Sequence, residues 1–141
     1  MAGECGGGKE MLATHLDLQP GVCINIVGDI PPDAKDFRIE LGKDLANIGL
    51  HFNPRFKYAK DTKIIAYNSR NDYIWGNEVK VKKFPFVPGS TAEINITFEG
   101  KQFKLKLPDG SEYTFPNRLN LESINFLGIT HDFNLRSLSF Q

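Results

Sequence analysis

The chain contains 141 residues with a mass of 15.9 kDa, which fits one domain that buries roughly two-thirds of the surface exposed by its unfolded form. Lysines and arginines number 17 and are balanced by 17 aspartates and glutamates, so the overall charge gives no general attraction to nucleic acid or to an anionic membrane. The two cysteines, Cys5 and Cys23, are too few for a disulfide framework, and no apolar stretch is long enough to insert into a membrane.

Residues 1–10 are rich in glycine and are predicted to form a flexible N-terminal extension, followed by one folded domain over residues 11–141. Gly3 to Lys9 has the spacing of a phosphate-binding loop, but Glu10 replaces the Ser or Thr that would bind magnesium, and no strand precedes it. We therefore predict no nucleotide and no other cofactor. The same segment lacks the basic and apolar regions of a secretory signal peptide, so we expect synthesis in the cytosol.

Two short apolar alternations begin the predicted domain. Leu16 and Leu18 favour a first strand that ends at Pro20-Gly21. Residues 22–26 alternate in the same way and predict a second strand ahead of Pro31-Pro32.

Three longer segments show the clearest alternation. Residues 37–41, 94–98 and 103–107 place an apolar side chain at every second position, as half-buried strands do. Glu99-Gly100 lies between the last two of these segments, and this predicts a hairpin with a tight turn.

The C-terminal third continues the pattern of short strands and turns. Pro108-Asp109-Gly110 predicts a turn with glycine at a positive φ, and residues 112–115 return as a strand. Residues 117–123 are the one segment compatible with a short helical turn, capped by Asn117 or Asn120. Because turn signals recur about every eight to twelve residues and no linker divides the chain, we predict an all-β fold, a two-sheet antiparallel sandwich.

The most informative segment is residues 50–56. If it is extended, Leu50 and Phe52 point into the core, while His51, Asn53 and Arg55 project together from the opposite face. Imidazole, carboxamide and guanidinium are directional hydrogen-bonding groups, whereas solvated strand faces favour Lys, Glu, Thr and Ser. The alignment favours a shared target, although taken alone it is also compatible with an ordinary solvent-facing strand.

The single tryptophan provides a second signal. Trp75 stands beside Gly76 between polar residues and lacks the apolar alternation of a core position. Its ring is therefore predicted to face solvent or a ligand, with a packing role as the alternative.

Together these groups describe a site for galactose. An indole ring attracts the weakly positive C–H face of the sugar, so Trp75 is a candidate platform. His51, Asn53 and Arg55 then surround the axial 4-hydroxyl. A site that fixes donors and acceptors around one hydroxyl rejects the epimer that lacks it, because its own groups stay unpaired.

Two further polar residues extend this predicted site. Glu78 is expected to hold Arg55 through a charge-assisted pair and to accept hydrogen bonds from the next sugar. Asn68 is expected to reach the 6-hydroxyl of galactose.

These residues resemble the signature of the galectin family, and the resemblance extends from about residue 11 to the C-terminus. The matching positions are His51-x-Asn53-x-Arg55, Asn68 and Trp75-x-x-Glu78, within HFNPRF and WGNE, with FPFVPGS at 84–90, LPDG at 107–110 and FPNRLNLESINF at 115–126. The resemblance implies a galectin-like, concanavalin A-like jelly roll with a shallow β-galactoside site on its concave sheet, no metal and no catalysis.

The resemblance also implies a role for each matching residue. His51, Asn53 and Arg55 bind the 4-hydroxyl region, Asn68 and Glu78 bind the 6-hydroxyl, Trp75 stacks on the ring, and Arg55 with Glu78 meets the adjoining glucose or N-acetylglucosamine.

Two positions depart from the family pattern. The family usually has an arginine two residues after the glutamate, where this chain has Lys80, which cannot make the same planar fork with Glu78. Lys80 is therefore a carbohydrate-binding candidate that is expected to alter preference at the second sugar. Some members have a histidine four residues after Arg55, where Ala59 leaves space for an extended glycan.

Other functions have weaker support. A glycosidase needs two carboxylates across the scissile bond, and Glu78 is the only one within the signature, with Asp61 and Asp72 as distant candidates. The three histidines lack metal-ligand spacing, so no metal site is predicted. The main alternative to a lectin is an intracellular protein-interaction module with weak sugar affinity, which would follow if Lys80 misplaced Glu78.

The expected partners are β-galactoside glycans and glycoproteins. The length suggests the one-domain type of the family, for which the resemblance implies a homodimer. Either the N-terminal strand near residues 12–18 or the C-terminal strand 133–140 could pair with its copy, unless these strands only pack at the sandwich edge. Within the latter strand the apolar parity changes after Leu135, which a bulge or a second buried face would explain. A dimer would crosslink glycoconjugates through avidity, and the resemblance implies that it agglutinates cells. The resemblance also implies a location both in the cytoplasm and outside the cell, with export that needs no signal peptide.

Overall fold

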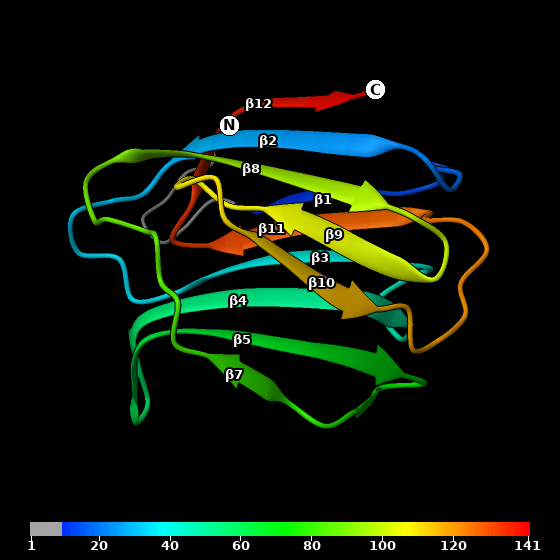
Figure 1. The fold of residues 1–141 in the computed structure, drawn as a ribbon, viewed down its shortest axis with the longest axis horizontal. Coiled ribbons are helices and arrows are strands. Elements are labelled where there is room, and N and C mark those ends of the chain that lie inside the picture. The colour runs from blue at the N-terminus through cyan, green and yellow to red at the C-terminus, as the bar shows by residue number, and fades with distance from the viewer. Residues whose placement is uncertain (1–9) are drawn as a thin grey trace.

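The structure, a computed structural model, describes residues 10–141 and confirms the predicted all-β sandwich. Residues 1–9 of the expected extension lie outside the described part. Residues 10–141 form twelve strands in two antiparallel sheets and contain no helix, so none of them forms a helix that could span a membrane. Figure 1 shows the two sheets as stacked layers of nearly parallel ribbons.

The larger sheet carries the segment of residues 50–56. Its strands, in spatial order, are β1 (Met11–Ala13), β11 (Phe126–His131), β3 (Phe37–Gly42), β4 (Ile48–Tyr58), β5 (Asp61–Asn71) and β6 (Ile74–Trp75), and β7 (Val79–Val81) also pairs with β5. The smaller sheet has the order β10 (Glu112–Pro116), β9 (Gln102–Lys106), β8 (Thr91–Phe98), β2 (Cys23–Asp29) and β12 (Asn134–Phe140).

The core lies between the two sheets and follows the predicted alternation. The apolar members of the segments 37–41, 94–98 and 103–107 are buried, each contributing about 1.5–3 kcal/mol to folding. Phe37 of β3 lies at the centre of an aromatic cluster. Its ring centroid is 6.3 Å from that of Phe52, 5.4 Å from that of Phe86 and 4.7 Å from that of Phe133. This packing buries one face of β3 and of β4 in the core. The polar side chains of both strands lie on the opposite face, where a site can form.

The two predicted turns are confirmed. Gly100 has a φ of +83° in the β8–β9 hairpin, and Gly110 has a φ of +85° between β9 and β10. Side chains with a Cβ rarely adopt this region, so glycine is the natural residue at both turns.

The predicted strand over Leu16 and Leu18 is wrong. The first strand is Met11–Ala13, and Leu18 forms only an isolated bridge with Ile124. His15 and Asp17 have φ angles of 60° and 53°, and these left-handed positions interrupt any continuous strand.

The helical turn considered for residues 117–123 does not form. Asn120 has a φ of 55°, which is outside the right-handed helical region. Asn117 instead ties this loop to the β8–β9 turn, because its Nδ2 donates to the carbonyl oxygens of Gly100 and Leu121 and its Oδ1 accepts from the Leu121 N–H.

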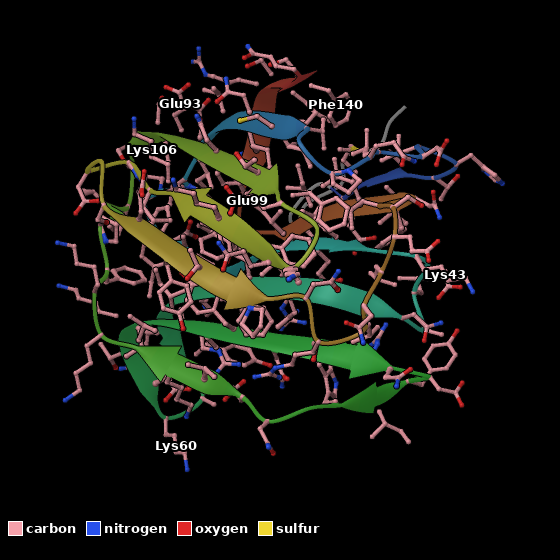
Figure 2. The ribbon with its side chains drawn as sticks, turned by 45° about the vertical axis from the view of Figure 1, so that its right-hand side comes forward. Lys43, Lys60, Glu93, Glu99, Lys106 and Phe140 are labelled. Atoms are coloured by element: carbon pink, nitrogen blue, oxygen red, sulfur yellow. The ribbon has the colours of Figure 1, made fainter. Side chains whose placement is uncertain are left out.

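Of the two causes considered for the parity change in the C-terminal strand, the structure shows the bulge. The pairing of β12 with β2 shifts between Leu135 and Ser137, which is a β-bulge. Leu135 and Leu138 therefore both pack against the core, while Phe140 stays exposed on β12 at the sheet edge, as Figure 2 shows. β1 and β12 are edge strands of their sheets.

Candidate functional site

Strand β4 presents its polar residues as the sequence predicts. Leu50 and Phe52 are fully buried in the core, and His51, Asn53 and Arg55 alternate with them on the opposite face of the larger sheet. The neighbouring strands cover these side chains closely: only 1% of Asn53 is exposed. Few atoms of these side chains reach the surface, so a ligand is selected by the donors and acceptors that those atoms still have free.

Asn53 is held by β3. Its Nδ2 donates to the carboxylate of Asp36 at 2.9 Å and to the carbonyl oxygen of Phe37 at 2.8 Å. Its Oδ1 accepts from Nε of Arg55 at 2.8 Å. Because both N–H groups of the amide are used, Asn53 can offer a ligand only the second lone pair of Oδ1.

His51 is held by a second carboxylate of β3. Its Nδ1 lies 2.5 Å from Oε2 of Glu40, the residue directly opposite His51 in the β3–β4 pairing. Burial raises the pKa of Glu40, but the hydrogen bond and charge of His51, with the charges of Arg70 and Arg38, bring it below its ordinary value. Glu40 is therefore a carboxylate at neutral pH.

Arg55 is held by two acidic residues outside β3. It donates from Nη1 to Asp61 at 2.6 Å and from Nη2 to Glu78 at 2.9 Å, with a longer contact from Nη1 to Glu78 at 3.5 Å. Burial lowers the pKa of Arg55, but these carboxylates raise it above its ordinary value. With the bond to Asn53, four of the five guanidinium N–H groups are used, which leaves one for a ligand.

Lys80 lies behind this pair rather than in the site. Its Nζ is 3.0 Å from Asp61 and 3.9 Å from Glu78. Its hydrogen bond is the main cause that lowers the pKa of Asp61, with Arg55 contributing further. Of the predicted residues, Lys80 is the one that does not line the hollow described below.

Asn68 stands directly opposite His51 on β5. Its Oδ1 accepts from the backbone N–H of Ser69 and from Arg118, and its Nδ2 donates to the carbonyl oxygen of Gly76 at 3.1 Å. One N–H of the amide remains free. A Cβ on Gly76 would lie 3.3 Å from Asn68 Oδ1 and 3.0 Å from Arg118 Nη1, so glycine allows this close approach.

Trp75 faces outward on the hairpin that β6 forms with β5. Its side chain is 45% exposed, as predicted for a residue outside the core. Its ring centroid lies 4.7 Å from that of His51, with the planes inclined at 62°. The guanidinium of Arg70 lies 5.0 Å from the indole centroid and fixes the ring further.

These side chains surround one open hollow of about 380 Å³. It is lined by Arg38, His51, Asn53, Arg55, Tyr58, Asn68, Trp75 and Glu78, so six of the seven predicted residues meet there. A larger hollow of about 860 Å³ lies at the other end of the sheet, between β1 and the β3–β4 loop, and contains none of them. We identify the smaller hollow as the candidate site, because the predicted hydrogen-bonding side chains and the tryptophan line it.

The residues that orient the predicted side chains were not among those predicted from the sequence. Asp36 and Glu40 hold Asn53 and His51, and Arg118 contacts Asn68. A signal for the first two was present: both alternate with the apolar side chains of the strand over residues 37–41, and a hairpin with the next strand would place them beside the polar face. Arg118 gave no such signal, because it comes from a loop distant in sequence.

The described residues contain no group of three or more His, Cys, Asp or Glu side chains arranged to hold a metal ion. What the hollow offers instead is a set of unused polar atoms beside an apolar surface. These atoms are His51 Nε2, one N–H each of Arg55 and Asn68, a lone pair of Asn53, and the lone pairs of the Glu78 carboxylate that Arg55 does not occupy. Such an arrangement recognises a hydroxylated ring with one apolar face.

Comparisons with known proteins agree with this geometry. Residues 11–140 match the family model described as galactoside-binding lectin. The chain is 44% identical to galectin-1 of Mus musculus over 131 residues, which is 93% of this chain and 97% of that protein. Among solved structures, CG-16, a homodimeric agglutinin from chicken liver, superposes with a TM-score of 0.91 at 40% identity and covers 94% of this chain and 100% of its own. The toad ovary galectin in complex with thio-digalactose has a TM-score of 0.90 at 34% identity, with coverage of 97% and 100%. The chain belongs to the galactoside-binding lectin family, the galectins.

Proposed function

We propose that the hollow over β4, β5 and β6 binds β-galactosides of the lactose and N-acetyllactosamine type, and that the protein is a lectin that catalyses nothing. The observation that carries this proposal is the convergence of unused donors and acceptors on a hollow of about 380 Å³ beside a half-exposed indole. The toad ovary galectin, which shares this fold, was solved with thio-digalactose bound.

Each residue has a role that its free atoms allow. Trp75 covers the C–H face of galactose, and His51 Nε2 and the free N–H of Arg55 bind the axial 4-hydroxyl. The free N–H of Asn68 binds the 6-hydroxyl. Glu78, whose carboxylate is half-exposed at the rim, accepts from the second sugar.

The rival interaction module has less support. It required Lys80 to misplace Glu78, but Glu78 Oε1 stays 2.9 Å from Arg55 Nη2 without help from an arginine at position 80. Arg55 is also bonded to Asp61, so the orientation of Arg55 in the hollow does not depend on a contact between Lys80 and Glu78.

The decisive experiment is retention on immobilised lactose. We expect the protein to bind and to elute with lactose but not with cellobiose, the disaccharide that differs from lactose only in its 4′-hydroxyl. Elution by both sugars would show that the protein does not recognise the axial 4′-hydroxyl. Failure to bind would favour the interaction module. Sustained release of chromophore from a chromogenic β-galactoside would overturn the absence of catalysis.

We also propose that the protein crosslinks glycoproteins as a homodimer, as suits a relative of a homodimeric agglutinin. The edge strands β1 and β12 leave backbone groups unpaired and carry exposed Leu12 and Phe140, which a second copy can cover. Sedimentation velocity should show a dimer, and red cells should agglutinate only at concentrations where the dimer forms. A monomer at all concentrations would refute this part of the proposal and leave sugar binding intact.

A further inference from the structure

Glu40 occupies a position that lectin function alone does not explain. It lies on the outer face of β3 and is mostly buried, and its Oε2 stands 2.5 Å from His51 Nδ1. The register of the sheet places the two residues directly opposite one another, so the contact is built into the strand pairing. No other protein atom is bonded to the His51 ring within residues 10–141.

The contact determines where His51 carries its proton. Arg38 on β3 and Arg70 on β5 also face this pair, and both favour the ionised form of Glu40. An ionised carboxylate only accepts hydrogen bonds, so His51 Nδ1 must be the donor. In a neutral imidazole the other nitrogen then has no proton and is an acceptor.

We propose that Glu40 is a positioning residue that fixes neutral His51 as the Nδ1–H tautomer, and that Nε2 thereby accepts the proton of the galactose 4-hydroxyl. The inference deepens the proposed function and rests on it for the identity of the sugar. It assigns a direction to the hydrogen bond at the hydroxyl that distinguishes galactose from glucose.

The surrounding groups explain why this direction matters. Arg55 has one N–H left and can only donate, and both amide N–H groups of Asn53 are used by Asp36 and Phe37. The hydroxyl therefore accepts from Arg55, and its own proton has two acceptors in reach, His51 Nε2 and the second lone pair of Asn53 Oδ1. With the opposite tautomer, His51 and Arg55 would both point donors at one hydroxyl oxygen, and the hydroxyl proton would be left with Asn53 Oδ1, which already accepts from Arg55.

The tautomer can be read directly without any sugar. Two-bond proton–nitrogen NMR correlations of the full chain labelled with 15N-histidine distinguish Nδ1–H from Nε2–H imidazole, and His15→Gln and His131→Gln assign the His51 signals. We expect the proton on Nδ1 in the wild type at neutral pH. In Glu40→Met, which removes the acceptor at similar length, we expect it mainly on Nε2, the form that an unconstrained histidine side chain prefers.

Sugar affinity then tests the consequence. Glu40→Met should weaken lactose binding about tenfold, as expected for one misdirected hydrogen bond in a closed site. Glu40→Gln should restore part of the affinity, because its side-chain oxygen can still accept from Nδ1. Glu93→Met is the matched control: Glu93 is an exposed carboxylate on β8 of the other sheet (Figure 2), and its loss should change lactose affinity less than twofold.

The outcomes separate the inference from the lectin proposal. A wild-type His51 protonated on Nε2 would overturn the inference, and this readout stands even if Glu40→Met fails to fold. A tautomer that switches in Glu40→Met without any loss of lactose affinity would also overturn it. Lack of lactose binding by a wild-type protein with the Nδ1 proton would refute the proposed function and with it the role of Nε2, while the assignment of the tautomer to Glu40 would hold.

Discussion

The ammonium group of Lys80 lies 3.0 Å from Asp61 and 3.9 Å from Glu78, so it supports Arg55 from behind rather than facing the hollow. A guanidinium at this position would form planar paired bonds with both carboxylates and would order Glu78 at the rim. We predict that Lys80→Arg raises the affinity for lactose about two- to fivefold, the effect of one further surface charge pair. Methyl β-galactoside, which lacks the second sugar, should bind with unchanged affinity in isothermal titration calorimetry.

The control for this variant is Lys82→Arg, since Lys82 is exposed and forms no ion pair within the described residues. It should leave both affinities unchanged. Equal gains for lactose and methyl β-galactoside in Lys80→Arg would mean that position 80 acts on the galactose site and not on the second sugar.

Trp75 and Tyr73 provide a matched pair of exposed aromatic residues on one hairpin. Trp75 lines the hollow, whereas Tyr73 is 67% exposed and does not. We predict that Trp75→Ala lowers lactose affinity at least about tenfold, because the sugar loses its apolar platform, while Tyr73→Ala changes it little. Thermal unfolding monitored by circular dichroism should show only small losses for either variant. A collapse of the Trp75→Ala fold would assign the indole to packing instead.

Alternation within one strand was enough to predict the polar face of β4. Period two fixes which side chains share a face, so the outward projection of His51, Asn53 and Arg55 followed from the buried Leu50 and Phe52. The carboxylates behind them were not predicted, because their role depends on which strand lies beside β4 and in which register. Glu40 lies opposite His51 only once the β3–β4 pairing is known.

Positive φ angles at residues other than glycine were a second feature of the fold that could not be predicted from the sequence. Turns containing Gly100 and Gly110 were found because glycine signals a positive φ. His15, Asp17 and Asn120 adopt positive φ angles without glycine, so the first strand and the segment after β10 were predicted as more regular than they are. The backbone bonds of Leu16 and Leu18 to Asn125 and Ile124 hold the segment that contains His15 and Asp17, and no local sequence pattern announces bonds to such distant residues.

Gly28 gives a test of the packing between the two sheets. A Cβ at this position on β2 would lie 2.2 to 2.8 Å from ring atoms of Phe133, which is buried and stacks near Phe37. The ring cannot move without displacing its neighbours, so we predict that Gly28→Ala lowers the free energy of unfolding by about 1–3 kcal/mol. Urea denaturation measures this loss. Wild-type stability in Gly28→Ala would show that the Phe133 ring has room to shift.

An ion pair lies at the bulge in β12, and a pH series can test its contribution to stability. Arg136, the residue at the register shift, donates from Nε to both carboxylate oxygens of Asp29 on β2, and Thr91 donates to one of them. The hydrogen bond of Thr91, followed by that of Arg136, lowers the pKa of Asp29 below its ordinary value of 3.8. A carboxyl group with a lowered folded pKa contributes stability that is complete above its unfolded pKa and is lost as the pH falls through the folded value.

We therefore predict that Asp29→Asn has a lower melting temperature than the wild type at pH 7, by a few degrees at most because the pair is exposed. The difference should stay constant down to about pH 5, shrink as the pH falls below 3.8, where the unfolded chain takes up a proton, and vanish only below the lowered pKa of the folded state. A melting-temperature difference that persists unchanged at pH 2 would show that Asp29 acts through the shape of its side chain and not through its charge.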